Sequence, residues 1–129
     1  MEANKVVVKF KDKRIMKGKT SDFFPNKKQF HLIDKTGETL DIEVEDLKAI
    51  FFVKDYEGNK DRRKVYQDEL TGTGRKMQVD FSDGESIIGF TLGYSPERQG
   101  FYLTPADAEG NNIRIFVVKS ATNNVAFIN

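Results

Sequence analysis

The charged residues with the most suggestive spacing lie in a basic cluster near the start of the chain. Lysine and arginine are interspersed there with apolar residues over positions 5–19, and Asp12 is the only acidic residue among them. If Phe10 points into a core, its neighbours Lys9 and Lys11 point outward, so several of these cations share one face of a hairpin. Such a face can bind phosphate groups. The candidates are Lys9, Lys11, Lys13, Arg14 and Lys17.

A second group of candidates is mostly aromatic and falls in or beside two loops. Aromatic side chains there could stack on nucleic-acid bases or on a protein partner, although such positions also serve as core. A lone histidine with no acid or nucleophile in a motif beside it does not predict catalysis. The candidates of this group are Phe23, Asn26, His31, Tyr94 and Tyr102.

Several kinds of chemistry are excluded or disfavoured by the composition. The chain has no cysteine, which excludes disulfides, thiolate zinc sites and cysteine nucleophiles. The acidic stretch over residues 34–46 has no Asp-x-Asp-x-Asp-Gly loop that would converge oxygens on a cation. We therefore expect no catalytic residues, no metal and no cofactor, and we expect that the protein is not an enzyme.

The sequence begins without a basic stretch followed by an apolar core, and its longest apolar runs hold only four or five residues. Neither a secretory signal nor a membrane span is expected. Together with the absence of cysteine, this favours a cytoplasmic location.

The second half of the chain repeats the first. At a constant offset of 71, residues 5–32 align with residues 76–103 without a gap, and nine of the 28 aligned positions are identical. Chance would give roughly two identities at usual residue frequencies. The identical pairs include Phe10/Phe81, Gly18/Gly89, Pro25/Pro96, Phe30/Phe101 and Leu32/Leu103. The sequence predicts an internal duplication: residues 1–54, a connecting segment at 55–75, and residues 76–129.

Each copy has the pattern of a strand-and-turn unit. Apolar residues alternate with polar ones over 6–10 and 77–81, and Ser82-Asp83-Gly84-Glu85 is a tight-turn signal whose counterpart is residues 11–14. Gly18 and Gly89 lie inside the second strand, where glycine indicates a sharp bend or a close backbone neighbour. Next comes a loop in which an aromatic residue stands two positions before a proline, at residues 23–25 and 94–96; we call it the aromatic-x-Pro loop. A third strand follows this loop. A fourth strand is expected at 40–44 and 113–118, and a fifth at 49–54 and 125–128.

The copies differ in charge. Residues 1–54 hold twelve basic and nine acidic residues, whereas residues 76–129 hold four and six. Lys9 aligns with Asp80 and Arg14 with Glu85. Three explanations of the basic cluster stay open: a site for an anionic partner, a surface that protects an edge strand, or a face that complements an acidic one in the same or a neighbouring molecule.

Two resemblances accompany this pattern. The order of first strand, turn, Gly18, Phe23, Asn26 and third strand resembles the first motif of Sm-like RNA-binding proteins, over about 25 residues per copy. The aspartate that follows the loop aromatic in that family is replaced by Phe24. The string 47–55 and the paired aromatic-x-Pro loops resemble an uncharacterised family of small bacterial proteins. The arginine and Asp/Asn-x-Ser-x-x-Gly motif of PilZ receptors for cyclic di-GMP is absent.

We therefore expect an all-β protein of two tandem five-stranded SH3-like or Sm-like barrels packed together. The expected function is non-enzymatic: a bacterial adaptor or regulatory module that recognises a protein partner through sheet edges or loop aromatics. The alternative is nucleic-acid binding, RNA above all, through the basic hairpin.

Overall fold

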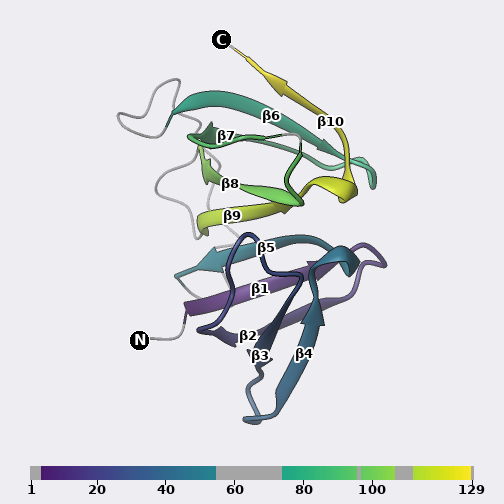
Figure 1. Cartoon of the computed structure of the whole chain (residues 1–129), viewed down its shortest axis with the longest axis vertical. Coiled ribbons are helices and arrows are strands. Elements are labelled where there is room, and N and C mark those ends of the chain that lie inside the picture. Colours follow the sequence, from purple (N-terminus) through teal and green to yellow (C-terminus); the bar gives the residue numbers. More distant parts are fainter. Residues whose placement is uncertain (1–3, 55–73, 96, 107–111, 129) are drawn as a thin grey trace, which may run out of the picture.

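The computed structural model describes residues 4–54, 74–95, 97–106 and 112–128. Its two halves have the same order of elements (Figure 1). The first half comprises β1 Asn4–Phe10, β2 Ile15–Thr20, β3 Gln29–Ile33, β4 Thr39–Glu43, the 3₁₀ turn η1 Val44–Asp46 and β5 Leu47–Val53. The second comprises β6 Arg75–Phe81, β7 Ser86–Thr91, β8 Gly100–Pro105, β9 Asn112–Val118, η2 Lys119–Ala121 and β10 Thr122–Phe127.

All described strands belong to one antiparallel sheet in the order β10-β6-β7-β8-β9-β5-β1-β2-β3-β4. The expected all-β class is confirmed. The arrangement differs from two separate closed barrels, because β5 pairs with β9 and joins the halves into one continuous, open sheet. Within each half the strand order is the same, with the fifth strand beside the first. The two free edges, β4 and β10, lie at opposite ends of the molecule (Figure 1).

Strand pairing repeats residue by residue between the halves. Val6 pairs with Gly18 in β1–β2, and Met77 pairs with Gly89 in β6–β7. The single pair Lys19–Ile33 recurs as Phe90–Thr104, again at the offset of 71 seen in the sequence. From the fourth strand onward the offset is 75, as in Gln29–Glu43 and Gly100–Val118. The extra four residues of the second half fall between β8 and β9.

The hairpin turns of the two halves are also equivalent. The amide of Phe10 donates to the carbonyl of Arg14, and that of Phe81 donates to Glu85. Gly84 has a φ of 96°, and Lys13 at the aligned position has a φ of 77° although it carries a side chain. The predicted equivalence of the turns at 11–14 and 82–85 is confirmed, and the first turn holds a lysine in the left-handed region that favours glycine.

The glycine inside the second strand of each half permits a close backbone contact. A Cβ atom at Gly18 would lie 2.4 Å from the carbonyl oxygen of Ile33, and one at Gly89 would lie 2.5 Å from that of Thr104. Of the two explanations that the sequence offers, close approach of a neighbouring backbone is therefore met at both positions. The third strand crosses the second at this point.

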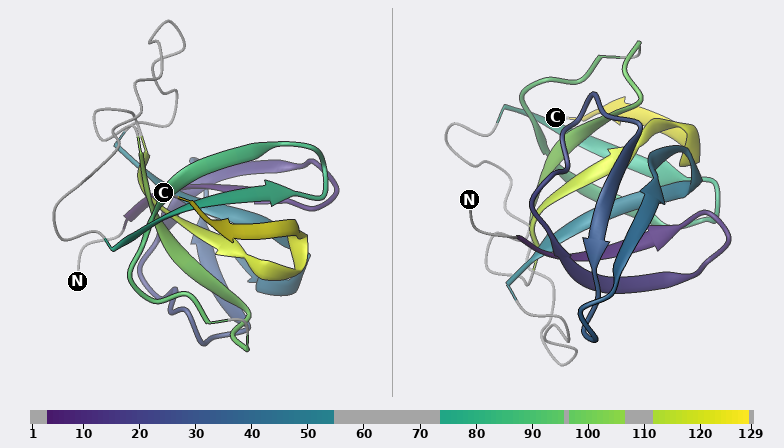
Figure 2. Two further views of the ribbon diagram at one scale, coloured as in Figure 1. Left: turned by 90° about the horizontal axis from the view of Figure 1, so that it is seen from above. Right: turned by 60° about the horizontal axis from the view of Figure 1, so that its bottom comes forward.

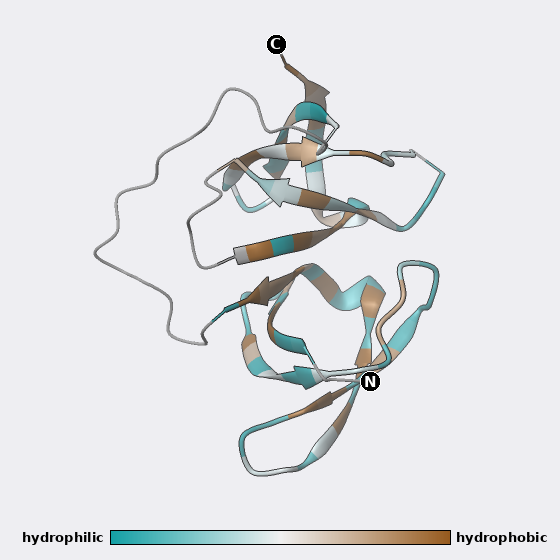
Figure 3. Ribbon diagram, turned by 90° about the vertical axis from the view of Figure 1, so that its left-hand side faces the viewer, coloured by the Kyte–Doolittle hydropathy of each residue, from teal (hydrophilic) through white to brown (hydrophobic). Residues whose placement is uncertain are grey.

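Two hydrophobic cores lie on opposite faces of the two strands that join the halves. On β5, Ile50 and Phe52 face the first core while Ala49, Phe51 and Val53 face the second. On β9, Phe116 and Val118 face the first core although they belong to the second half. Figure 3 shows hydrophobic residues along both strands, and Figure 2 shows how the strands of each half curve.

This double burial explains why the sheet is continuous. Every residue of β5 is buried. Its sequence is therefore a nearly continuous apolar run, and it lacks the alternation of apolar and polar residues that is typical of a strand with one solvent-exposed face. A closed barrel with its own surface would leave one face of β5 in water. Residues 47–53 therefore need an apolar neighbour on each side, and β9 with the second half supplies it.

The predicted strands differ from the observed ones by a few residues at their ends. Arg75, expected in the connecting segment, is the first residue of β6. Gly74 precedes it, and the remaining residues 55–73 of that segment lie outside the described residues, as does Pro96. Among the described residues, no helix is long and apolar enough to cross a membrane.

Candidate binding surfaces

The open ends of the sheet are the first candidate surface. Among the described strands, β4 pairs with β3 alone and β10 with β6 alone. An edge strand offers unpaired backbone groups that can accept another extended chain. The edges differ in character, because β4 exposes Asp41 and Glu43 whereas β10 contains no charged residue.

The basic hairpin of the first half borders an open groove of about 340 Å³. One wall carries Lys9, Lys13 and Arg14, and the other carries the acidic turn of the second half with Asp83 and Glu85. Arg14 is paired with Asp12 at 2.8 Å and stacks on Phe10, and Lys9 Nζ lies 4.6 Å from the ring centre of Phe51. The basic hairpin therefore faces an acidic turn of the same molecule.

Lys48 joins the two halves across this groove. Its ammonium lies 2.7 Å from Asp83 Oδ2, contacts Glu85 Oε1, and sits over the ring of Phe81. Burial alone would lower the pKa of Lys48, but hydrogen bonds to Asp83 and Glu85 outweigh it and raise that pKa. The hydrogen bond from Lys48, then that from the Glu85 amide, lowers the pKa of Asp83.

Lys48 was not among the residues predicted from sequence, and neither were its two acidic partners. A signal was available, because Lys48 is the one charged residue within the apolar run 47–53. A lysine buried in such a run requires an anionic partner nearby. The pairing of β5 with β9, which brings Asp83 and Glu85 close to Lys48, could not be predicted from the sequence.

The remaining basic candidates are dispersed. Lys11 donates a hydrogen bond from Nζ to Ser120 Oγ at 2.7 Å, again across the two halves. Lys17 is exposed on β2, on the side opposite to the buried Gly18. The five predicted basic residues therefore do not form a single cationic surface, because several of them contact acidic or polar groups of the same molecule.

The loop aromatics pack against the cores. Phe23 lies 5.2 Å from Phe30 and 4.9 Å from Phe116, measured between ring centres. Tyr94, its counterpart, lies 5.0 Å from Phe101 and 6.1 Å from Phe127. Both are partly buried, whereas the loop neighbour Phe24 is 49% exposed and Asn26 is exposed.

Tyr102 is half-buried where the two halves meet. It packs near Phe52 and Phe116, and the Arg114 guanidinium lies 4.5 Å from its ring centre and 4.6 Å from that of Phe52. Burial raises the pKa of the Tyr102 hydroxyl, and the nearby Arg114 charge opposes that rise. Tyr102 is therefore mainly a packing residue of the junction.

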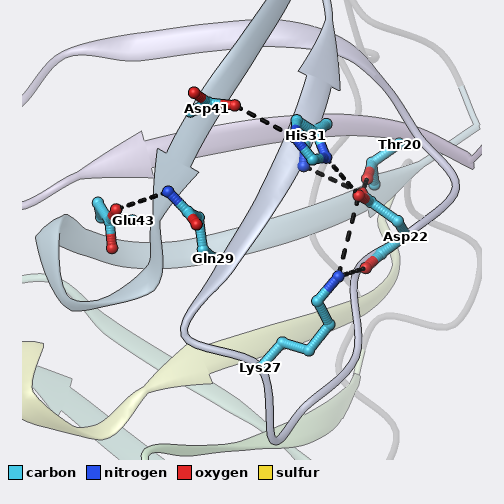
Figure 4. Close-up of polar contacts among 7 residues, drawn as sticks. All are labelled: Thr20, Asp22, Lys27, Gln29, His31, Asp41 and Glu43. Carbon is cyan, nitrogen blue, oxygen red and sulfur yellow. Dashed lines mark hydrogen bonds and ion pairs between the residues drawn. The ribbon is translucent and has the colours of Figure 1, made fainter.

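His31 lies between two carboxylates on the outer face of β3 and β4 (Figure 4). Its Nδ1 is 2.6 Å from Asp22 Oδ2, and its Nε2 is 3.2 Å from Asp41 Oδ1. Lys27 Nζ is 3.9 Å from Asp22 Oδ2, and Gln29 donates to Glu43. The ring can donate to both carboxylates at once only when both of its nitrogens carry protons.

Asp22 is the centre of this network. Desolvation alone would raise the pKa of Asp22, but hydrogen bonds from the His31 side chain, the His31 amide and Thr20 lower it overall. Because the Asp22 carboxylate also accepts the backbone amide of His31 at 3.0 Å, it fixes the loop to the start of β3. The acid partners of His31 come from the loop and the neighbouring strand, so no local motif in the sequence marks them.

In the described parts of the chain, no group of three or more histidine, aspartate or glutamate side chains could hold a metal ion. The contacts of the His31 network link the loop at Asp22 to β3 and β4. The hydroxyl of Thr20 also donates to Asp22, at 3.2 Å.

Comparison with known proteins gives one match. Neither a curated protein nor a solved structure matches the chain. The sequence pattern of one family covers residues 2–129, which is nearly the whole chain. The protein therefore belongs to the family of unknown function DUF6982.

Proposed function

We propose that this protein is a non-enzymatic binding module that recognises a protein partner through a free edge of its sheet. The observation that supports this most is the open sheet, whose edge strands β4 and β10 each pair with one strand among those that the structure describes. Addition of a strand to such an edge is a recurrent mode of peptide recognition. A role as a cytoplasmic adaptor or regulator in bacteria is part of the proposal.

The equivalent halves support a proposal about origin as well. Matching registers, matching turns and the strand order shared by both halves are what a duplicated unit would give. We propose that each half descends from a small five-stranded unit related to SH3-like or Sm-like barrels, opened where β5 meets β9.

The test of the binding proposal uses proline to block one edge at a time. The amide of Val44 donates to Lys28, and amides alternate in direction along a strand, so the amide of Asp41 points to the free edge of β4. The amide of Ile128 donates to Lys76, so the amide of Val125 points to the free edge of β10. Asp41→Pro and Val125→Pro therefore remove outward donors and retain the inner ladder.

Partners captured from an extract of the source cells would be purified, and their affinity measured against the wild type and both variants. The proposal predicts that one variant loses binding at least tenfold while its circular dichroism and melting temperature stay near those of the wild type. An affinity that neither variant changes would contradict edge recognition.

Nucleic-acid binding through the basic hairpin is the second candidate, and exposed Lys13 and Lys17 favour it. Labelled RNA and DNA would be titrated at low and moderate salt against the wild type and the Lys9→Glu/Lys11→Glu/Arg14→Glu variant. Binding that weakens with salt and is lost in the variant would support this function. No binding even at low salt would eliminate it, which is the result we expect because the hairpin faces Asp83 and Glu85.

A further inference from the structure

β10 occupies in the second half the place that β5 occupies in the first, but no described strand lies beside it as β9 lies beside β5. Val8 pairs with Ile50, and the aligned Val79 pairs with Val125. Val6 pairs with Phe52, and Met77 pairs with Phe127. Phe52 is 4% exposed, whereas Phe127 is 40% exposed. Ile50 is fully buried and Val125 only partly.

Two side chains of β9 pack beside β5 and shield its apolar residues from water. Phe116 pairs with Ile50 across the two strands. It is fully buried in the first core, and Val118 two residues later is 2% exposed there. Phe116 also contacts the loop aromatic Phe23, at 4.9 Å between ring centres. The first core is thus completed by an aromatic and an aliphatic residue from a neighbouring strand.

The second core has the equivalent residues from its own half, but no described strand beyond β10 adds an aromatic and an aliphatic residue to it. Tyr94, the counterpart of Phe23, contacts Phe127 and Phe101. In the part of the chain that the structure describes, no strand pairs with the outer side of β10, and no aromatic residue is placed there as Phe116 is placed beside Ile50. Arg75 lies over the Phe127 ring, 3.8 Å from its centre, much as Arg114 lies over Phe52.

The outer edge of β10 has an irregularity in its pairing near Thr122, but it has none of the charged side chains or prolines that usually protect an edge strand. Its residues 122–127 include no lysine, no other charge and no proline. The other end of the sheet cannot serve as its partner in a second copy. By the repeat, Asp41 and Glu43 of β4 stand where Phe116 and Val118 stand on β9, so pairing of β4 with β10 would place carboxylates against Val125 and Tyr94.

We infer that the outer edge of β10 binds an extended segment of a partner protein, antiparallel to β10, with an aromatic residue opposite Val125 and an aliphatic residue two positions after it. This inference rests on the proposed function and specifies its edge and the chemistry of its partner. The β5–β9 pair is the template, because it is the same edge with such a strand in place.

The probe is a fluorescent peptide with the sequence of residues 112–119, preceded by two lysines for solubility. The control peptide carries Asp and Glu at the positions of Phe116 and Val118, as β4 does. Anisotropy titrations of the full-length protein should show binding of the first peptide at least tenfold tighter than binding of the control. Val125→Pro should weaken that binding at least tenfold, and Asp41→Pro should leave it unchanged.

Hydrogen exchange of individual amides gives a second measurement that does not depend on a variant. The amides of Val125 and Phe127 should exchange rapidly in the free protein and become protected when the first peptide is added. Equal binding of both peptides, or binding without this protection, would overturn the inference. Protection in the free monomer would mean that the chain itself covers β10, and protection that grows with protein concentration would mean that a second copy does; either result overturns it.

These outcomes are separable from failure of the proposed function. If the peptide does not bind while a purified partner still loses affinity on Asp41→Pro, the inference about β10 is wrong and edge recognition stands. If a partner binds and neither proline variant affects it, the proposed function itself is wrong.

Discussion

β5 and β10 are the same strand of the repeat in two different surroundings. Both pair with the first strand of their half in the same register, including an irregularity near one end. β5 is buried along its whole length because a core lies on each face and β9 lies along its other edge. β10 has a core on one face only and no neighbour along its outer edge among the described strands.

The side chains follow this difference in surroundings. Ala49, Phe51 and Val53 of β5 face the second core, and at the equivalent positions on β10 stand Asn124, Ala126 and Ile128. This face of β10 is thus less apolar than the same face of β5, because Asn124 stands for Ala49 and Ala126 for Phe51. The other face of β10 carries Val125 and Phe127, which are apolar like Ile50 and Phe52 at the equivalent positions of β5.

The largest expected effect comes from truncating the same phenylalanine in each half. Phe52→Ala should lower the free energy of unfolding by about 3–5 kcal/mol, because the side chain is buried among core aromatics. Phe127→Ala should cost about 1 kcal/mol, because part of that side chain is already in water. Urea unfolding of both variants measures the difference, and equal losses would contradict the comparison.

The groove between the halves gives the next largest effect. Lys48→Met removes the charge that pairs with Asp83 and Glu85 and keeps the side-chain volume, so it should lower the free energy of unfolding by about 1–3 kcal/mol at neutral pH. The pKa of Asp83 is lowered from 3.8 in the fold, so its contribution is present above that pH and is lost as the pH falls below it.

The difference in stability between wild type and Lys48→Met should therefore persist from neutral pH down to about 3.8, the unfolded value of the Asp83 pKa, and shrink as the pH falls below it. Urea unfolding at a series of pH values measures this, and Lys17→Met on an exposed lysine is the matched control. A difference that stays constant with pH would show that Lys48 acts through packing alone.

The smallest effect comes from the two hairpin turns. Lys13→Gly should raise the free energy of unfolding by about 1 kcal/mol, since it relieves a left-handed residue. Gly84→Lys should lower it by a similar amount, since the position has open space but a φ that favours glycine. Thermal unfolding of the two variants checks the signs, and a loss in Lys13→Gly would mean that the lysine side chain makes a contact worth more than the strain.

Much of the fold could be predicted from the sequence because the repeated residues are those that a strand-and-turn unit constrains most. Gly18, Gly89 and the alternating strands were recognised from local pattern, and the structure supplies the close backbone contacts that explain them. The joining of the halves could not be predicted, because the apolar run 47–53 fits a buried strand in many arrangements. Pairing between β5 and β9 depends on contacts more than 50 residues apart in the chain.

The candidate residues were harder to interpret for the same reason. The basic cluster was evident in the sequence, but its acidic counterpart lies on a turn about 70 residues away. His31 was singled out without its partners, since Asp22 and Asp41 meet it only after the loop and β4 are in place. Exposure of an apolar residue such as Phe127 at an unpaired edge has no local signature in the sequence.

Hydrogen exchange of four amides in the free protein tests the central claim most directly. The amides of Ile50 and Phe52 point toward β9, and those of Val125 and Phe127 occupy the same positions on β10 and point to its free edge. The first pair should exchange only on global unfolding, and the second should exchange orders of magnitude faster. Equal protection of the two pairs would contradict the claim that β10 is an open edge.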